Sequence, residues 1–474
     1  MGKLPRRFGA NGKGRKMELR RLRQETHAAP RMTFLKRLFW VYFLLLIFEG
    51  ALRKWVFPQL SGPLLLVRDP IAIFIIWEAY RTHKWPKRWS AVVGILSISM
   101  LALCTLQVVS GETTWLIALY GLHSYLLPFP VAFIMGENLD VEDLRRFGVW
   151  TLWLLLPLTL LAVMQYHGAS NSIWNVGANK GSVQLNYAGG HVRASETFSY
   201  VTGPANYVPL AAAFICYGLV DDKFAKKWLL YAAAIAVPIS VAVIGSRSLL
   251  VLLAMLLGCV AVAAAVGVSQ LTSVLKVVAA LAVLTLLASQ LPIFSEAMDT
   301  FQTRLSEASG SEGTAQNLWE REFTEFSNTN ITDTGVPWYG QGVGTGSNVA
   351  STLLAGTQQF MAGEGEFGRV FIEFGLPFGG AFLLFRFLLA LAVAARAFSK
   401  VRDNQPLAWF LVPLMFSAML GTLEQPTIQG FMVLSLGFSL AAIKGAATPV
   451  ASLPMHSNLS RNSGPHLRPR TIRR

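Results

Sequence analysis

Two arginines stand at predicted helix entrances, where a guanidinium group can bind an anion. Arg247 lies in VAVIGSRSLLVLL, between two apolar runs that almost no loop separates, and Ser246 and Ser248 flank it. A guanidinium at the end of a membrane helix is costly unless it faces a partner or a wet cavity. Arg193 lies in HVRASETFSYVTGPANY, directly before another apolar run. Because a planar guanidinium donates two hydrogen bonds at once, we expect the two arginines to bind a diphosphate; the alternatives are snorkelling for Arg247 and an ordinary loop arginine for Arg193.

A group of carboxylates at the end of a long hydrophilic stretch is the second candidate for chemistry. Glu364, Glu366, Arg369 and Glu373 occur within GEGEFGRVFIEFGLPFGG. Steps of three and four residues place the last three on one face of a helix. A carboxylate here can serve as a general base, with its pKa raised by burial or held down by the arginine.

Other charged residues near span ends have structural alternatives. Arg68 and Asp69 open the second apolar run, where we expect a local ion pair; a substrate contact by Arg68 is the alternative. Arg53 and Lys54 follow the first run and are expected to snorkel to the interface. Glu424 lies in the last short loop, where it has either a structural role or a place in the same cavity.

Chemistry that needs a metal or a serine nucleophile lacks its motifs. The sequence contains no HExxH, no Cys/His ligand set and no GxSxG, so neither a metal nor a cofactor is expected. His123 and His191 are single residues with an expected structural role. The segment WYGQGVGTGSN allows close backbone approach to a ligand, but without a following Gly-Lys-Ser/Thr it is not a nucleotide-binding loop.

The composition is that of a membrane protein. Of 474 residues, 53% are hydrophobic and 14% are charged, and the mean hydropathy is +0.45, whereas a soluble domain has about 25% charged residues. Three cysteines exclude a disulfide-stapled secreted domain. The net charge of +15 comes from short basic segments between apolar blocks. This pattern is typical of cytoplasmic loops, so no nucleic acid partner is expected.

The apolar blocks predict an all-α polytopic protein with about twelve transmembrane helices, each near the ~20 residues that a bilayer requires. A basic N-terminal arm over 1–37 and a disordered basic tail over 445–474 flank a membrane domain over 38–444. Short amphipathic helices are expected within 296–328. The twelve predicted spans are 38–53, 63–80, 90–109, 114–136, 147–166, 203–220, 227–244, 248–268, 273–293, 367–395, 407–424 and 427–443.

The charge of the loops predicts the orientation. With a cytoplasmic N-terminus, the inside segments hold most of the Lys and Arg residues, among them those in 81–88, 145–146, 223–227 and 396–402. Cytoplasmic loops carry such an excess, so both ends are expected inside and the loops 167–202 and 294–366 outside. Long loops are usually functional. No cleaved signal peptide is expected, because the first apolar run begins late and no small-residue cleavage site follows it.

These residues resemble the superfamily of O-antigen ligases and Wzy-type polysaccharide polymerases. The resemblance rests on RASETF at 193–198, GSRSLL at 245–250, the G-x-G run at 342–346, E-x-x-G-x-x-G at 373–379 and the two enlarged outer loops. It implies a metal-independent glycosyltransferase of GT-C-like fold in the bacterial inner membrane. It also implies an undecaprenyl-diphosphate-linked glycan as substrate, bound through its diphosphate by the arginines at 193 and 247.

One departure from the family pattern bears on the activity. Ligases of this superfamily carry a catalytic histidine shortly before the tenth span, and this loop has none; the corresponding residue is Glu364. A polymerase that joins lipid-linked repeat units is therefore expected, with Glu364 or Glu366 as base, and with membrane lipids, a chain-length regulator and a flippase as partners. The alternatives are a ligase, a transporter of lipid-linked or charged solutes, and a non-catalytic scaffold. A transporter is less expected, because no inverted repeats are found.

Overall fold

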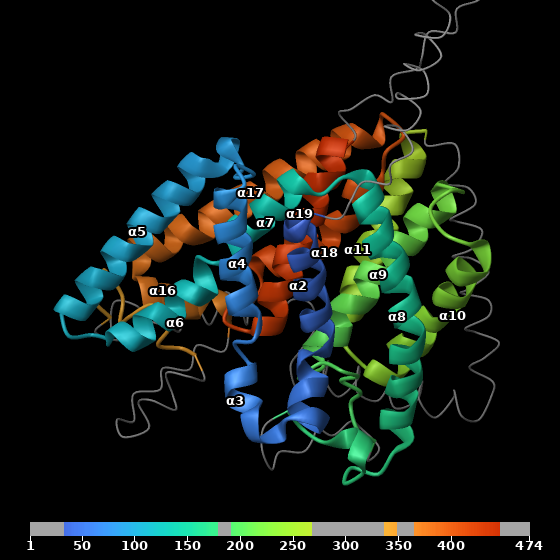
Figure 1. Cartoon of the computed structure of the whole chain (residues 1–474), viewed down its shortest axis with the longest axis horizontal. Coiled ribbons are helices and arrows are strands. Elements are labelled where there is room, and N and C mark those ends of the chain that lie inside the picture. Colours follow the sequence, from blue (N-terminus) through green and yellow to red (C-terminus); the bar gives the residue numbers. More distant parts are fainter. Residues whose placement is uncertain (1–32, 179–190, 268–335, 348–364, 446–474) are drawn as a thin grey trace, which may run out of the picture.

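The computed structural model describes residues 33–178, 191–267, 336–347 and 365–445, and the regular structure within them is helical (Figure 1). The longer helices are α2 (Phe34–Ala51), α4 (Arg68–Arg81), α5 (Ser90–Val109), α6 (Trp115–Tyr125), α7 (Pro128–Asn138), α8 (Val141–His167), α9 (Thr202–Val220), α10 (Lys227–Ile244), α11 (Arg247–Ala265), α16 (Glu366–Phe374), α17 (Leu376–Val401), α18 (Leu407–Leu420) and α19 (Pro426–Gly445). Shorter elements are the π-helical turn η1 (Leu52–Val56), α3 (Ser61–Leu64) and the 3₁₀ turns η2 (Pro58–Leu60), η3 (Lys87–Trp89) and η4 (Ile173–Asn175).

Nine helical stretches in the described part of the chain are long and apolar enough to cross a membrane, which is the architecture of a polytopic membrane protein. Two further predicted spans correspond to α2, which carries three charged residues, and to α18, which has only 14 residues. The predicted span 273–293 and the predicted amphipathic helices within 296–328 lie outside the described residues. Twelve spans therefore remain a prediction. The nine stretches are Pro58–Arg81, Lys87–Val109, Trp115–Asn138, Val141–His167, Thr202–Val220, Lys227–Ile244, Arg247–Ala265, Leu376–Val401 and Pro426–Gly445.

The prediction of one continuous span over 367–395 is wrong, because the chain breaks at Gly375. This residue has φ 75° and separates α16 from α17. A Cβ atom at Gly375 would lie 2.0 Å from the carbonyl oxygen of Trp338, so only glycine fits both the dihedral angle and the space. Helix α16 is consequently a short separate helix, and the spanning helix α17 begins after it.

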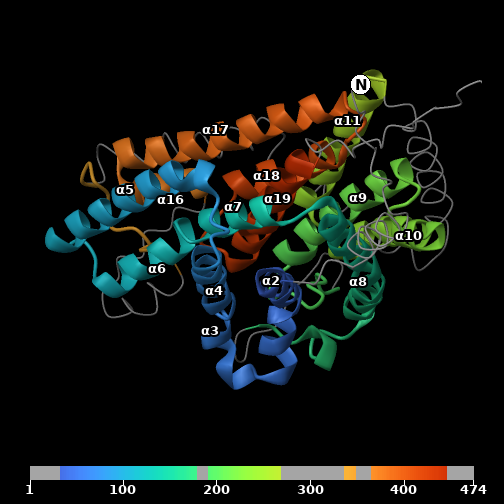
Figure 2. The same cartoon turned by 45° about the horizontal axis from the view of Figure 1, so that its top comes forward.

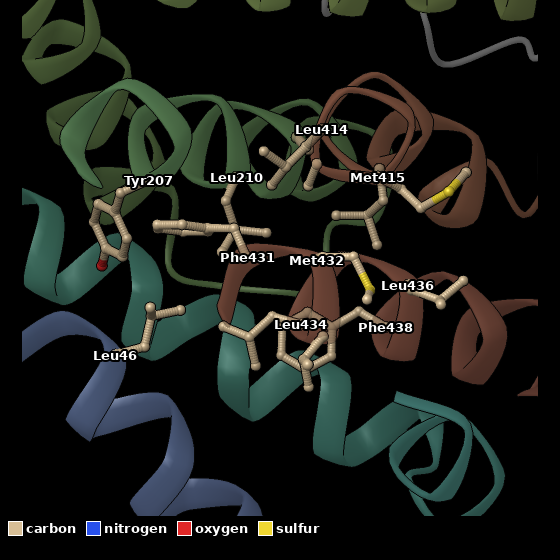
Figure 3. Packing of buried hydrophobic residues seen from close by; sticks show 14 of the residues in the cluster. Leu46, Tyr207, Leu210, Leu414, Met415, Phe431, Met432, Leu434, Leu436 and Phe438 are labelled. Carbon is tan, nitrogen blue, oxygen red and sulfur yellow. The ribbon is translucent and has the colours of Figure 1, made fainter. Parts of the chain in front are cut away.

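Helices α9 and α19 form the centre of the bundle. Helix α19 packs against α7, α18, α9, α8, α2 and α17. Phe431, Met432 and Phe438 of α19 are fully buried, and α9 and α18 place Leu210 and Met415 toward the same layer (Figure 3). Figures 1 and 2 show α8, α10 and α11 on one side of this centre and α5, α6 and α16 on the other. Membrane helices are held together mainly by close van der Waals packing of such side chains, because the surrounding lipid is as apolar as they are.

Small residues let α7 and α19 approach each other closely. A Cβ atom at Gly136 already lies 2.5 Å from Cβ of Leu440 when it is built in place, and one at Gly437 lies 2.9 Å from Sδ of Met135. Neither position has room for a methyl group without displacing the neighbouring helix.

We therefore expect Gly136→Ala to lower the free energy of unfolding by about 1–3 kcal/mol, because the added methyl group forces α7 and α19 apart. Gly258→Ala on α11 is the matched control, since nothing lies within 4 Å of its added Cβ atom. Melting of both variants in detergent measures the difference. Equal melting temperatures would show that the α7–α19 contact is not tight.

Candidate functional site

One end of the bundle collects most of the buried charged side chains, and we call it the polar end. Helix α2 ends there and α4 begins there, because Arg68, the first residue of α4, contacts Glu49 in the last turn of α2. Arg68 also donates to the carbonyl oxygen of Pro426, so α19 begins at the same end. Helices α9 and α11 start there as well, since α9, α10 and α11 alternate in direction through short connections.

A cationic cluster lies where α2, η1 and α4 meet. It consists of Glu49, Arg53, Lys54 and Arg68, which are 2–4% exposed. Arg53 Nη1 lies 3.5 Å from Glu49 Oε1, and Arg68 Nε lies 3.2 Å from Glu49 Oε2. One carboxylate is thus shared by two guanidinium groups. Burying charges in this way requires pairing and hydrogen bonds around each group.

The segment 195–199, which leads into α9, covers this cluster. Lys54 Nζ donates to Ser195 Oγ at 2.6 Å and to the Glu196 carbonyl oxygen at 3.1 Å. Arg53 Nη1 donates to Ser199 Oγ at 2.8 Å. The backbone of the segment lies so close to α2 that a Cβ atom at Gly50 would be 2.2 Å from the carbonyl carbon of Phe198. Snorkelling, expected for Arg53 and Lys54, is wrong: both cations are buried and bound by this segment.

A glutamine from α8 fixes the turn that carries Glu196. Gln165 Oε1 accepts from the amides of Ser195 and Glu196 at 3.1 and 2.7 Å, and Gln165 Nε2 donates to the Glu196 carbonyl oxygen at 3.2 Å. Glu196 has φ 53°, in the left-handed region that a residue with a side chain rarely adopts. Three hydrogen bonds from one side chain therefore hold a strained backbone in place.

The Glu196 carboxylate is fully buried, and neither of its oxygens has a hydrogen-bond partner among the described residues. Burial raises the pKa of this carboxyl group to about 8, and the nearby ammonium of Lys54 opposes the shift. Burial away from water disfavours the ionised form of a carboxyl group. Burial likewise lowers the pKa of the Lys54 ammonium to about 7. Ionisation of this buried pair is therefore disfavoured at both groups, and the two arginines that share Glu49 are the lasting cations of the cluster.

Glu49 carries the charge balance of this cluster. We expect Glu49→Ala to destabilise the protein by about 3–5 kcal/mol, because it leaves two buried guanidinium groups without their carboxylate. Glu142→Ala is the control: that side chain is 53% exposed and its pairs with Arg145 and Arg146 are 3.6 Å long, so its loss costs about 1 kcal/mol or less. A melting curve for Glu49→Ala like that of Glu142→Ala would contradict the buried-pair account.

A second cluster, the acidic cluster, surrounds α16. It contains Glu366, Arg369 and Glu373 from α16, Arg386 from α17 and Glu424 from the α18–α19 turn. Arg386 is fully buried and its Nη1 donates to Glu366 Oε1. Arg369 Nη1 lies 3.5 Å from Glu424 Oε2. Arg369 and Glu373 lie together on α16 as the spacing predicted, and Glu424 contacts Arg369 of this helix. Whether Glu424 has a structural role or a place in a substrate cavity stays a prediction.

The glycine-rich segment folds onto this cluster. The amides of Gly344 and Gly346 donate to the two oxygens of Glu373 at 3.0 and 2.7 Å. Gln107 of α5 donates to the carbonyl oxygens of Glu373 and Tyr339 at 2.7 and 2.6 Å. In this structure the backbone of the glycine-rich segment closely approaches the carboxylate of Glu373 on α16. Glu373 therefore positions this segment.

Glu424 lies between two helices and is 7% exposed. Burial and the nearby carboxylate of Glu373 raise the pKa of Glu424 well above its ordinary value, while Arg369 opposes the shift. Two carboxyl groups so close together disfavour the ionisation of both at once.

The α18–α19 turn joins the two clusters. Arg386 donates to the carbonyl oxygens of Met419 and Gly421, each at 2.5 Å. Arg369 pairs with Glu424 in the turn itself. Arg68 of the cationic cluster binds the Pro426 carbonyl oxygen directly after the turn. Three arginines from three different helices therefore hold one short connection.

The structure distributes the predicted site residues over the polar end. Arg68 belongs to the cationic cluster, and Glu366, Arg369 and Glu373 belong to the acidic cluster. Half-buried Arg193 and Arg247 lie at the same end, before α9 and in the first turn of α11, and these two helices pack against each other. Glu364 lies outside the described residues.

The expected pair of Arg68 with Asp69 is replaced by two longer-range contacts. Arg68 binds Glu49, whereas Asp69 Oδ2 lies 3.2 Å from His123 Nε2. His123 also contacts the Tyr120 carbonyl oxygen at 3.0 Å, and His191 stacks on Tyr166 with ring centroids 4.3 Å apart. Both histidines thus have packing and polar contacts within the bundle, and their structural role stays a prediction.

Sequence reasoning missed the charged partners that lie inside apolar runs. Glu49 and Arg386 each stand within a stretch whose hydropathy predicts a membrane span, and Glu196 lies within the RASETF segment. A single charge within an apolar run was the available signal, because such a residue needs a partner in the bundle. Gln107 and Gln165 gave no signal.

The described residues contain no group of three or more His, Cys, Asp or Glu side chains placed to hold a metal ion. The arrangement offers instead buried basic side chains beside the hydroxyl groups of Ser195 and Ser199, and a set of buried carboxyl groups around α16. Comparison of the sequence with models of protein families and with curated proteins gives no match. The resemblance described above therefore remains an expectation drawn from the residues quoted for it.

Proposed function

We propose that this protein is a polysaccharide polymerase that joins undecaprenyl-diphosphate-linked oligosaccharide repeat units at the periplasmic face of the bacterial inner membrane. The single observation that supports this most directly is the cationic cluster, in which the buried basic side chains Arg53, Lys54 and Arg68 surround one carboxyl group, that of Glu49. Arg193 and Arg247 add two guanidinium groups at the same end of the bundle. A lipid-linked diphosphate is an anion that reaches such a site from within the bilayer.

The proposed chemistry needs neither nucleotide nor metal, because the diphosphate is already a good leaving group. Arg193 and Arg247 would bind the diphosphate and neutralise the charge that develops as the glycosidic bond breaks, a contribution of several kcal/mol. Arg68 keeps one buried nitrogen, Nη1, without a hydrogen-bond partner among the described residues. This leaves a donor for an anion within the cationic cluster.

The proposed orientation follows the distribution of basic residues. Arg88, Arg145, Lys227 and Arg396 lie at the end of the bundle opposite the polar end, on or beside η3, α8, α10 and α17. The excess of basic residues there is typical of the cytoplasmic side. The polar end then faces the periplasm, where a flippase delivers lipid-linked repeats and a chain-length regulator can contact the same face.

The test is a reconstitution. Purified protein in liposomes that contain the undecaprenyl-diphosphate-linked oligosaccharide is expected to give a ladder of longer lipid-linked products without added nucleotide sugar. Transfer only to a different acceptor, with no ladder, would identify a ligase. Movement of the lipid across the bilayer without new glycosidic bonds would identify a transporter and reject the proposal.

A further inference from the structure

We propose that Glu196 is the catalytic base, the group that accepts the proton of the attacking sugar hydroxyl; this inference rests on the proposed polymerase function. It replaces the expectation that Glu364 or Glu366 has this role. Glu366 is held in an ion pair with Arg386 on α17. The assignment to Glu196 depends on three independent features of the segment before α9.

The first feature is a carboxylate with unused hydrogen-bonding capacity. Glu196 is 0% exposed, and both carboxylate oxygens lack a hydrogen-bond partner among the described residues. Buried polar side chains are almost always paired, and each exception needs an explanation. A sugar hydroxyl is a donor that would satisfy these oxygens.

The second feature is backbone strain. Glu196 has φ 53°, although a glycine at this position would adopt the angle without cost. Gln165 fixes the strained turn through both amides and the carbonyl oxygen of the segment. A side chain kept at a costly position, without a contact that repays the cost in stability, points to a role in function.

The third feature is the surroundings. The groups around Glu196 are Lys54 of η1, which donates to its carbonyl oxygen, Tyr207 of α9 and uncharged Gln165 of α8. Arg193 precedes Glu196 by three residues on the same segment. Arg193 is one of the two proposed ligands of the diphosphate. The base and the leaving-group ligand therefore lie on the same short segment.

The proposed step transfers one proton and one glycosyl group. The acceptor hydroxyl gives its proton to the Glu196 carboxylate while its oxygen attacks the anomeric carbon of the donor. The bond from that carbon to the diphosphate oxygen breaks, and its electron pair leaves with the diphosphate. Glu196 then passes the proton to the departing diphosphate and returns to its ionised form.

The segment 195–199 keeps the Glu196 carboxylate away from water, which suits a catalytic base. The segment 195–199 is fixed to α2 and η1 by three side-chain hydrogen bonds, from Thr197 to the Ile47 carbonyl oxygen at 2.6 Å and from Lys54 and Arg53 to Ser195 and Ser199. An incoming glycan that displaces this segment exposes the carboxylate. Until then water is excluded, so the base does not activate water against the donor.

Burial raises the pKa of Glu196 to about 8, which is close to neutral pH. A general base is most effective when its pKa lies near the working pH. Since the ionised form is the active one, turnover of the wild type should rise as the pH increases toward about 8. Glu196→Gln removes the group that titrates, so its residual activity should lose this rise.

The test compares stability with activity in the same variants. Glu196→Gln and Glu196→Gly are each expected to lose about 100-fold or more of the polymerisation rate, the range for a lost general base, while lipid binding persists. Glu196→Gly should also melt at a higher temperature than the wild type, because it removes both the strain and the buried carboxyl group. His83→Gly is the control: His83 is exposed with φ 54°, so this variant should gain stability and keep its activity.

Different failures are distinguishable. If the wild type forms ladders and Glu196→Gln forms them at a similar rate, Glu196 is not the base and the polymerase function stands. If both Glu196 variants melt below the wild type, the carboxyl group is structural and the inference is overturned. If the wild type itself forms no ladder, the proposed function fails and the inference fails with it.

Discussion

Arg247→Ala is expected to abolish polymer formation while the protein still inserts and folds. Arg247 is half-buried in the first turn of α11, two residues after Gly245, which has φ 59° and ends α10. The left-handed angle of Gly245 forms the turn between the two helices, and it does not depend on which residue stands at position 247. Loss of one preorganised donor to a developing anion typically costs about 100-fold to 1000-fold in rate.

The measurement is the ladder of lipid-linked products in liposomes, with single repeats accumulating in the variant. Arg396→Ala is the matched control, because this arginine is exposed on α17 at the opposite end of the bundle. Arg247→Lys should recover only part of the activity, since an ammonium group lacks the planar fork. Polymer of wild-type length from Arg247→Ala would remove this residue from the site.

Arg386→Ala is expected to have the largest effect on stability. The side chain is 0% exposed within a spanning helix and binds Glu366, the Met419 carbonyl oxygen and the Gly421 carbonyl oxygen. Its removal leaves a buried carboxylate and two carbonyl groups without their donor. Breaking a buried pair from one side costs about 3–5 kcal/mol.

The double variant Arg386→Met/Glu366→Gln tests whether this cost comes from the orphaned charge. It removes both charges at similar volume, so it should recover much of the melting temperature lost by Arg386→Ala. Unchanged melting of Arg386→Ala would contradict the account. Equal loss in the double variant would show that the carbonyl contacts to the α18–α19 turn carry the stability instead.

Local spacing predicted the part of the site that lies on one helix. Arg369 and Glu373 are four residues apart, so their common face on α16 follows from helical geometry alone. The end of α16 was not predicted, because Gly375 within an apolar run gives no signal of its positive φ. Only the close approach of Trp338, from a distant segment, makes the break necessary.

Pairs formed by tertiary packing could not be predicted in the same way. Arg53 and Ser199 are 146 residues apart in the chain, and Lys54 and Ser195 are 141 residues apart. Nothing in either local sequence identifies the other. The positive φ of Glu196 could not be predicted either, because glutamate has no preference for this angle and the hydrogen bonds of Gln165 that fix the backbone come from a distant helix.

The charged end of α2 has a consequence for biogenesis. During synthesis, Arg53 and Lys54 at the end of α2 leave the ribosome long before Ser195 and Ser199 exist to bind them. Until then Arg53 has Glu49 within reach on its own helix, whereas the contacts with the segment 195–199 are missing. Final seating of α2 is therefore expected to be a late event, completed when the chain has been translated as far as α9, and a polypeptide released before that point would expose α2 to quality-control proteases.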